Sequence, residues 1–301
     1  MNILCIIDTP KWAFHRNCLA LQRYGKNTYN IRFGKNDKYK NAFHQLKKYD
    51  LILYWTDVRP NYLVKHNPPR SKTIMMIRSD VFKTCKPKQL QYFKESKLMT
   101  KHVKAFMTAN RYLTQVFKSK YGNKTYYAPG GVDTEIFKPR GERKIFKPCR
   151  VGWAGSKKNF GSTARGLGII QTACKRVGFK WRPALREKRW RTPDEMSNYY
   201  ANEIDLYIDL WQFSGRQNGI LEAAACGVPV VSCAKGIAPE LSKHGLVLCQ
   251  RNVKSVCAAL LKANRNNWAL GKQLQRHVLK EWNWKLHTEY WERIFEQVVS
   301  E

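Results

Sequence analysis

The stretch WQFSGRQNGILEAAACGVPVVSCAKGIAPE, residues 211–240, decides the fold class. The segment EIDLYIDL at 203–210 precedes it and predicts a strand. Residues 218–226 predict a helix that ends at Gly227, since Pro229 prevents its continuation. The polar, glycine-rich loop between strand and helix is therefore expected at the carboxyl end of a strand, where open α/β sheets bind their ligands.

This loop has the chemistry of an anion site. Backbone N–H groups at a helix N-terminus, together with Arg216, suit a phosphate, and Glu222 can accept hydrogen bonds from sugar hydroxyls. The residues outline a nucleotide-sugar site, although an ordinary strand–loop–helix unit with a solvated glutamate fits the same pattern. The candidate donor-binding residues here are Ser214, Gly215, Arg216, Gln217, Asn218, Gly219 and Glu222.

Three separated segments resemble the retaining glycosyltransferases of the GT-B fold. YYAPGGVDTEIFKP at 126–139 resembles the NGVD-x-x-x-F-x-P segment that ends the first domain of that family. VGWAGS at 151–156, followed by Arg165-Gly166, resembles the strand, loop and Lys-Gly that open the second domain and bind the donor diphosphate. EAAACGVPVV at 222–231 is similar to the second carboxylate of the E-x7-E motif and its continuation.

The chain departs from this family at one position of that motif. Ser214 stands where the family usually has the first glutamate, which contacts the donor sugar, so the resemblance does not identify the sugar. The resemblance covers most of the chain from about residue 125 onward, and the first half is similar in layout only.

The resemblance implies an α/β protein of the GT-B class, with two Rossmann-like, doubly wound domains facing a central cleft. We expect an acceptor-binding domain over 1–140, a nucleotide-sugar-binding domain over 141–283, and a terminal helix over 284–301 that crosses back to the first domain. The charged, proline-bounded segment at 138–148 is typical of an interdomain linker.

Alternating strands and helices in both halves indicate parallel sheets built from βαβ units. We expect strands at 2–8, 29–33, 50–55, 73–78, 105–109 and 124–127, and in the second half at 150–153, 180–183, 204–209, 229–233 and 245–248. The last helix, at 284–299, has aromatic residues at helical spacing along one face.

The resemblance also implies a mechanism, sugar transfer with retention. Arg165, Lys157 and Lys158 would stabilise the charge on the leaving nucleoside diphosphate, and Gly155 and Ser156 would contact the donor. We expect no metal and no cofactor beyond the nucleotide-sugar co-substrate, such as a UDP-sugar. The sequence contains no D-x-D, and positive side chains can take the electrostatic role of a metal.

Three further candidates follow predicted strands of the first half. His15 is placed by the resemblance near the cleft, within reach of the diphosphate, although a histidine here is more often packed or at the surface. Asp57 or Asp80 could orient or deprotonate the acceptor hydroxyl. Each aspartate also fits the commoner role of a helix N-cap.

The second signal in the sequence is its high positive charge. The chain has 55 Lys and Arg against 22 Asp and Glu, a net charge of +33. Such a charge favours a polyanionic partner, because self-repulsion disfavours it otherwise. A basic run in the first half is interleaved with aromatic residues, which suits phosphate contacts and base stacking, although a solvated surface over core aromatics is the alternative. Its candidate nucleic-acid-binding residues are Lys83, Lys86, Lys88 and Lys94.

Two partners besides the nucleotide sugar fit this charge. Bacteriophage members of the GT-B class glycosylate hydroxymethylated bases in DNA. We place DNA first, with such a base as acceptor, because the basic run has only a weak apolar stripe and does not resemble a strong membrane-docking helix. An anionic membrane that carries a lipid-linked or cell-envelope acceptor is second. A third hypothesis is a non-catalytic nucleic-acid-binding module on a degenerate GT-B scaffold, which the loss of the glutamate at Ser214 motivates.

The expected location is the cytoplasm, that of the host if the protein is encoded by a bacteriophage, and we expect a monomer. The nine cysteines include no C-x-x-C pair and suit reduced, buried thiols. The first residues lack the pattern of a signal peptide, and no apolar run is long enough to span a membrane.

Overall fold

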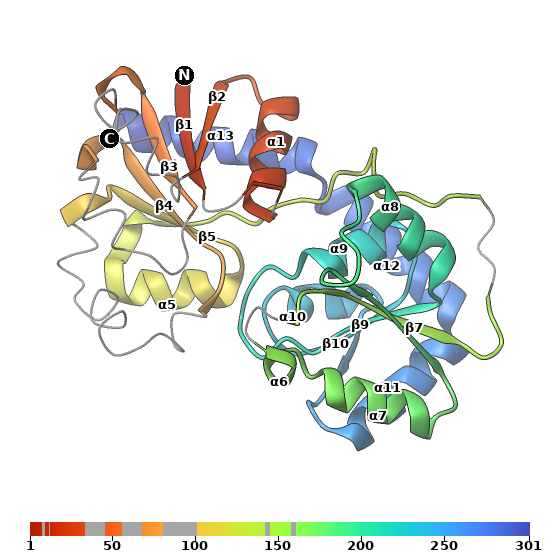
Figure 1. Ribbon diagram of the computed structural model, residues 1–301. Helices are drawn as coiled ribbons and strands as arrows, with labels where there is room; N and C mark the ends of the chain where they lie inside the picture. Colours follow the sequence, from red (N-terminus) through yellow and green to blue (C-terminus); the bar gives the residue numbers. More distant parts are fainter. Residues whose placement is uncertain are drawn as a thin grey trace. The chain divides into compact units, whose positions relative to one another are not determined.

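The computed structural model forms two compact α/β units (Figure 1). It describes residues 1–7, 10–11, 13–33, 46–55, 68–80, 101–141, 145–157 and 161–301. The first unit comprises Met1–Gly130, Ser214–Arg216 and Trp284–Glu301, and the second comprises Gly131–Phe213 and Gln217–Asn283. None of the described helices is long and apolar enough to cross a membrane.

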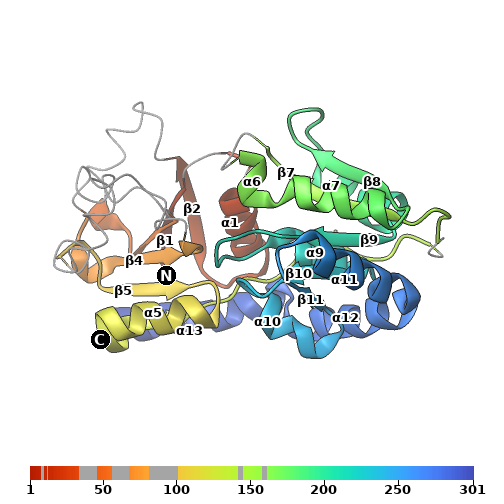
Figure 2. The same cartoon turned by 90° about the horizontal axis from the view of Figure 1, so that it is seen from below.

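The first unit is built on a parallel sheet in the order β2-β1-β3-β4-β5-β6. Its strands are β1 (Asn2–Ile7), β2 (Thr28–Phe33), β3 (Leu51–Tyr54), β4 (Thr73–Ile77), β5 (Ala105–Thr108) and β6 (Thr125–Tyr127). Helices α1 (Ala13–Tyr24) and α13 (Trp284–Ser300) pack on one face, and α5 (Arg111–Tyr121) packs on the other. Helix α1 lies beside β2 in both views (Figures 1 and 2).

The second unit is built on a parallel sheet in the order β11-β10-β9-β7-β8. Its strands are β7 (Arg150–Gly155), β8 (Lys180–Leu185), β9 (Leu206–Asp209), β10 (Val230–Cys233) and β11 (Val247–Cys249). Its α-helices are α6 (Gly161–Arg165), α7 (Leu167–Arg176), α8 (Pro193–Asn198), α9 (Asn218–Ala225), α10 (Ala238–Leu241), α11 (Val253–Arg265) and α12 (Asn267–Glu281). Helices α7 and α11 cover one face of the sheet, and α9, α10 and α12 cover the other (Figure 1).

The sequence predictions of strands and parallel sheets are confirmed. Every expected strand is present, with its ends displaced by at most two residues, and the helices expected at 218–226 and 284–299 correspond to α9 and α13. Strands β3, β4, β5 and β9 are buried at every position. Such strands read as continuous apolar runs in the sequence, because helices cover both faces of a parallel sheet.

Each sheet reverses its strand order at one point. In the second unit the chain runs from β7 outward to β8 and then returns to β9 on the opposite side of β7. In the first unit it runs from β1 to β2 and then to β3 in the same way. Loops at the carboxyl ends of the two strands that flank such a switch point leave an opening, where α/β proteins bind ligands. The loops after β7 and β9 therefore form the expected binding position of the second unit.

Helix α13 is held to the first unit by one buried carboxylate. The Oε1 atom of Glu292 accepts hydrogen bonds from the Lys26 amide at 2.8 Å, the Asn27 amide at 3.0 Å and the Tyr29 hydroxyl at 2.8 Å. The Asn27 side-chain amide also donates to it, at 2.8 Å. Burial, with Glu292 adding to it, raises the pKa of Tyr29, so the phenol remains a donor. The last helix is thus tied to the turn between α1 and β2.

Replacing Glu292 by alanine should lower the free energy of unfolding by about 3 kcal/mol or more, because several buried donors lose one acceptor together. Urea unfolding followed by circular dichroism measures this change. Glu296→Ala removes an exposed carboxylate from the same helix and should change stability by less than about 0.5 kcal/mol. Equal stability of the two variants would contradict the role given to Glu292.

Candidate functional site

The switch point of the second unit brings together residues from three parts of the sequence. Gly155 ends β7, Ser156 and Lys157 follow it, and the segment from Leu210 follows β9. A side chain at Gly155 would place its Cβ 2.7 Å from the Trp153 ring, which requires glycine at the end of the strand. The Ser156 hydroxyl donates to the Glu187 carboxylate. These contacts fix the main chain after β7, where the nucleotide-sugar donor is expected.

Arg165, the predicted ligand of the diphosphate, ends the short helix α6. Its guanidinium carbon lies 3.9 Å from the centre of the Trp211 indole, and its Nε is buried without a hydrogen-bond partner among the described residues. Burial lowers the pKa of Arg165, with the Asp209 carboxylate acting in the opposite direction. A partly desolvated guanidinium gains from an anionic ligand that supplies hydrogen-bond acceptors.

Asp209, at the end of β9, is the neighbouring carboxylate. It is 6 % exposed, and one of its oxygens accepts from the Trp211 amide at 2.9 Å. Burial raises the pKa of Asp209, while Arg165 and this amide oppose the shift. Burial thus disfavours the charged form of both side chains, while each of them favours the charged form of the other.

The N-terminus of α9 presents its first amides to the same edge of the sheet. Gln217 is the N-cap residue, but its side chain caps no amide of the helix. Instead its Nε2 donates to the Lys235 carbonyl and its Oε1 accepts from the Ile237 amide, both at 3.3 Å. A helix start without a side-chain cap suits an anion, since its N–H groups and dipole both favour negative charge.

Glu222 lies in α9, one turn from this helix start. It is 7 % exposed, and its Oε2 accepts a hydrogen bond from the Tyr200 hydroxyl at 3.0 Å. Burial raises the pKa of Tyr200, and the carboxylate adds to the effect, so the phenol stays protonated. Tyr200 therefore fixes the orientation of the Glu222 carboxylate.

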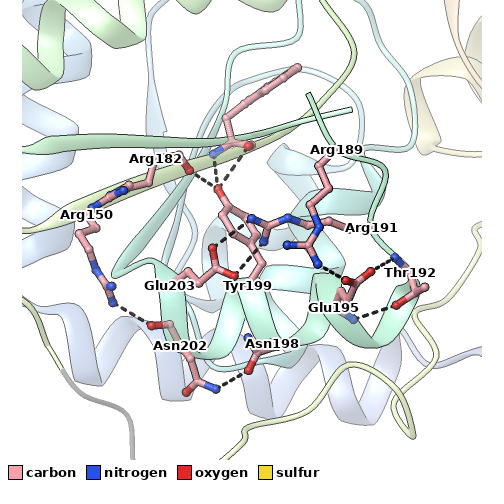
Figure 3. Close-up of polar contacts among 11 residues, drawn as sticks. Arg150, Arg182, Arg189, Arg191, Thr192, Glu195, Asn198, Tyr199, Asn202 and Glu203 are labelled. Atoms are coloured by element: carbon pink, nitrogen blue, oxygen red, sulfur yellow. Dashed lines mark hydrogen bonds and ion pairs between the residues drawn. The ribbon is translucent and has the colours of Figure 1, made fainter. Parts of the chain in front are cut away.

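The segment that carries Tyr200 is itself fixed by a polar network. Tyr199 and Tyr200 begin a π-helical segment, η5 (Tyr199–Glu203). The Tyr199 hydroxyl accepts from the Trp153 amide at 3.1 Å and donates to the Arg182 carbonyl. Figure 3 shows this contact beside the bidentate ion pair of Arg191 with Glu203. The network joins η5 to β7 and β8, and thereby holds Tyr200 next to Glu222.

The helix N-cap of α8 completes the same network. The Thr192 side chain accepts from the Glu195 amide at 3.2 Å, and the Glu195 carboxylate accepts from the Thr192 amide at 2.8 Å (Figure 3). This reciprocal capping box fixes the start of the helical stretch that leads into η5. Arg189 also donates to Glu195.

Ser214, Gly215 and Arg216 make their contacts within the first unit. The Ser214 carbonyl accepts from the Asp80 amide at 2.8 Å, and Gly215 forms an antiparallel bridge with Ser79. The Arg216 side chain donates to the Asn17 amide oxygen at 3.0 Å. A donor role for these three residues stays a prediction, as does an acceptor role for Asp80, which is buried beside them.

His15 is placed in α1 of the first unit. Its Nδ1 accepts from the Lys11 amide at 2.9 Å, and its ring lies 5.5 Å from that of Phe33. Burial lowers the pKa of His15, which favours the neutral imidazole. These contacts are those of a packed histidine, and its catalytic role stays a prediction.

Other predicted residues lie outside the described part of the chain. They are Asp57, Lys158, Lys83, Lys86, Lys88 and Lys94. Among the residues that the structure describes, no group of three or more His, Cys, Asp or Glu side chains could hold a metal ion.

Two residues of this site have no sequence signal of their own. Tyr200 occurs in the run NYYANE, which suggests core packing, and its contact with Glu222 spans 22 residues of sequence. Trp211 directly follows an apolar strand and has the appearance of its continuation. Only the three-dimensional contacts show that these side chains support Glu222 and Arg165.

Comparisons with known proteins show similarity of fold. No family model and no curated protein matches this sequence. Sucrose-phosphate synthase (tll1590) from Thermosynechococcus elongatus superposes with a TM-score of 0.75 at 11 % identity, covering 100 % of both chains. Anabaena Alr3699/HepE, solved with UDP and glucose, gives 0.74 at 14 % identity, over 99 % of this chain and 100 % of the other.

A glycosyltransferase from Rickettsia africae ESF-5 gives a TM-score of 0.71 at 11 % identity, over 100 % of this chain and 99 % of the other. Identities this low establish the fold alone. The expected α/β class with two Rossmann-like, parallel-sheet domains of the GT-B type is confirmed.

Gly219 offers a test of the packing behind α9. A Cβ at this position would lie 2.1 Å from the Tyr207 hydroxyl, so Gly219→Ala should displace the first turn of α9 and lower stability by about 1–3 kcal/mol. Gly168→Ala is the matched control, because no atom lies within 4 Å of the added Cβ in helix α7. It should raise stability by about 0.5–1 kcal/mol. Urea unfolding of both variants measures these changes. An unchanged stability of Gly219→Ala would show that this helix start is not tightly constrained.

Proposed function

We propose that this protein is a glycosyltransferase that uses a nucleotide-sugar donor, such as a UDP-sugar. The observation that carries the proposal is the grouping of Glu222, Arg165 and the uncapped start of α9 at the switch point of the second unit. It is supported by the fold, which this chain shares with Anabaena Alr3699/HepE, a protein solved with UDP and with UDP-glucose.

Each group has a distinct task in this proposal. Glu222, held by Tyr200, accepts hydrogen bonds from hydroxyls of the nucleotide sugar. Arg165, Lys157 and the first amides of α9 bind the diphosphate. As the bond between sugar and diphosphate breaks, negative charge grows on the leaving group, and fixed positive groups stabilise that charge more than the ground state.

Transfer with retention is part of the proposal and rests on the family motifs. The departure at Ser214 leaves the sugar open, since a hydroxyl replaces the carboxylate that contacts the sugar in that family. The basic side chains at the diphosphate take the electrostatic role of a metal ion, so we expect activity in the presence of a chelator.

Replacing Glu222 by alanine should weaken donor binding by about 1–3 kcal/mol, through the loss of charge-assisted hydrogen bonds. Calorimetry with a panel of nucleotide sugars measures this, together with the slow release of nucleoside diphosphate in the absence of acceptor. Glu281→Ala, which removes an exposed carboxylate of the same unit, should leave both unchanged. Unaltered donor affinity in Glu222→Ala would refute the site.

The proposed acceptor is a hydroxymethylated base in DNA, in the host cytoplasm if a bacteriophage encodes the protein. The net charge of +33 supports a polyanionic acceptor, because phosphate neutralisation offsets the self-repulsion of the protein. A lipid-linked or envelope acceptor on an anionic membrane is the alternative, since the same charge suits such a surface.

The acceptor hypotheses differ in how charge removal affects two ligands. If the basic run of the first half binds DNA, its quadruple alanine variant should lose DNA affinity and show a shallower salt dependence, by about 0.9 in log–log slope for each lost phosphate contact. The substituted residues are Lys83, Lys86, Lys88 and Lys94. The control removes equal charge from exposed positions of the second unit, namely Lys254, Lys262, Lys272 and Lys280.

Binding is measured with a DNA duplex and with phosphatidylglycerol vesicles. Loss of DNA binding in the first variant but not in the control supports the DNA acceptor, and mass spectrometry of nucleosides then identifies the product. If only vesicle binding falls, the acceptor is on a membrane. If DNA binds tightly while no nucleotide sugar is bound or cleaved, the chain is a nucleic-acid-binding module and not an enzyme.

A further inference from the structure

Helix α6 and the segment after β9 are tied together around Arg165. The Gln212 amide donates to the Ala164 carbonyl at 3.2 Å. Arg251, which follows β11, donates through Nε to the Leu210 carbonyl at 2.8 Å and through Nη2 to the Thr163 carbonyl. One guanidinium thus bridges the main chain on both sides of the site. Both of these hydrogen bonds end on main-chain carbonyls, and neither involves a side chain that could bind the nucleotide sugar.

The junction between α6 and α7 is tightly packed. Gly166 has a φ of +68°, the left-handed conformation that favours glycine. A Cβ there would lie 2.8 Å from the Leu210 Cβ and 3.5 Å from the Arg251 guanidinium. The main chain next to Arg165 is therefore packed directly against Leu210 and close to the Arg251 guanidinium.

Trp211 packs against the Arg165 side chain itself. Its indole is stacked under the guanidinium at 3.9 Å, and the residue is only 6 % exposed. Its main chain is fixed at both ends, because its amide donates to Asp209 at 2.9 Å and its carbonyl accepts from the Cys233 thiol at 3.2 Å. The aromatic surface on which Arg165 rests is therefore part of the sheet edge and not of a free loop.

We propose that Trp211 and Arg251 are positioning residues that hold the Arg165 guanidinium where the diphosphate of the donor meets it. The inference rests on the proposed function, since it assigns the ligand of the same site. An arginine side chain loses many rotamers when it binds a phosphate, and a stacked, preorganised guanidinium has lost them before the ligand arrives. Trp211 touches the Arg165 guanidinium itself, whereas Arg251 binds the carbonyls of Thr163 and Leu210. Neither residue needs to touch the nucleotide sugar.

A double-mutant cycle on UDP binding tests this proposal, with ADP and GDP as further probes of the diphosphate. Trp211→Leu and Arg251→Met should each weaken nucleoside diphosphate binding about tenfold in a chain that carries Arg165. In the Arg165→Ala background the same changes should have less than about a threefold effect, because no guanidinium is left to position. Trp211→Phe, which retains an aromatic face, should recover most of the affinity.

Trp181→Leu is the matched control, since it removes a partly buried indole that belongs to β8 of the same unit and packs against its core. It should lower thermal stability but not diphosphate affinity. Should Trp211→Leu fail to fold, Arg251→Met, which is closer to the surface, carries the same cycle. Equal losses with and without Arg165 would overturn the positioning role. Absence of nucleoside diphosphate binding in the folded wild-type protein would instead overturn the proposed function, and the inference with it.

Discussion

A buried carboxylate that collects main-chain amides is the interaction on which each unit depends. In the first unit Glu292 gathers donors from the turn after α1. In the second, Asp205 is fully buried and accepts from the Arg150 amide at 2.7 Å and the Phe146 amide at 3.1 Å. Burying a charge is costly unless hydrogen bonds replace its hydration, and these donors do so. The carboxylates thereby fix α13 to the turn after α1 in the first unit, and the segment that leads into β7 in the second.

This use of acidic residues changes the electrostatics of the surface. Among the described residues five acidic side chains are buried, whereas Arg78 is the one buried Lys or Arg. The acidic five are Asp80, Asp205, Asp209, Glu222 and Glu292. Because the chain has 55 basic and 22 acidic residues, withdrawing acids into the interior leaves the solvent-facing surface more basic than the composition suggests. Fold stability and the positive charge of the surface are thus coupled through the same few carboxylates.

The fold was predictable because its signals are local. Strands buried on both faces leave unbroken apolar runs, and α9 has its end marked by Gly227 and Pro229 in the sequence. The position of Glu222 was predictable for the same reason, since a helix that follows a strand presents its first turns to the carboxyl edge of the sheet. The residue that supports Glu222 was not predictable. The Tyr200 contact joins separate elements, and a tyrosine in the run NYYANE gives no indication of its partner.

Arg165 shows why such support is needed. The cation was located by its motif, but it ends a helix of five residues, too short to hold a long side chain by itself. Its place is therefore determined by tertiary contacts: the Trp211 indole beneath it and the carbonyls that Arg251 joins. Neither Trp211 nor Arg251 is near Arg165 in sequence, and neither periodicity nor spacing relates them to it. A motif can specify which charge is present, while the geometry that makes the charge useful comes from residues that the motif does not contain.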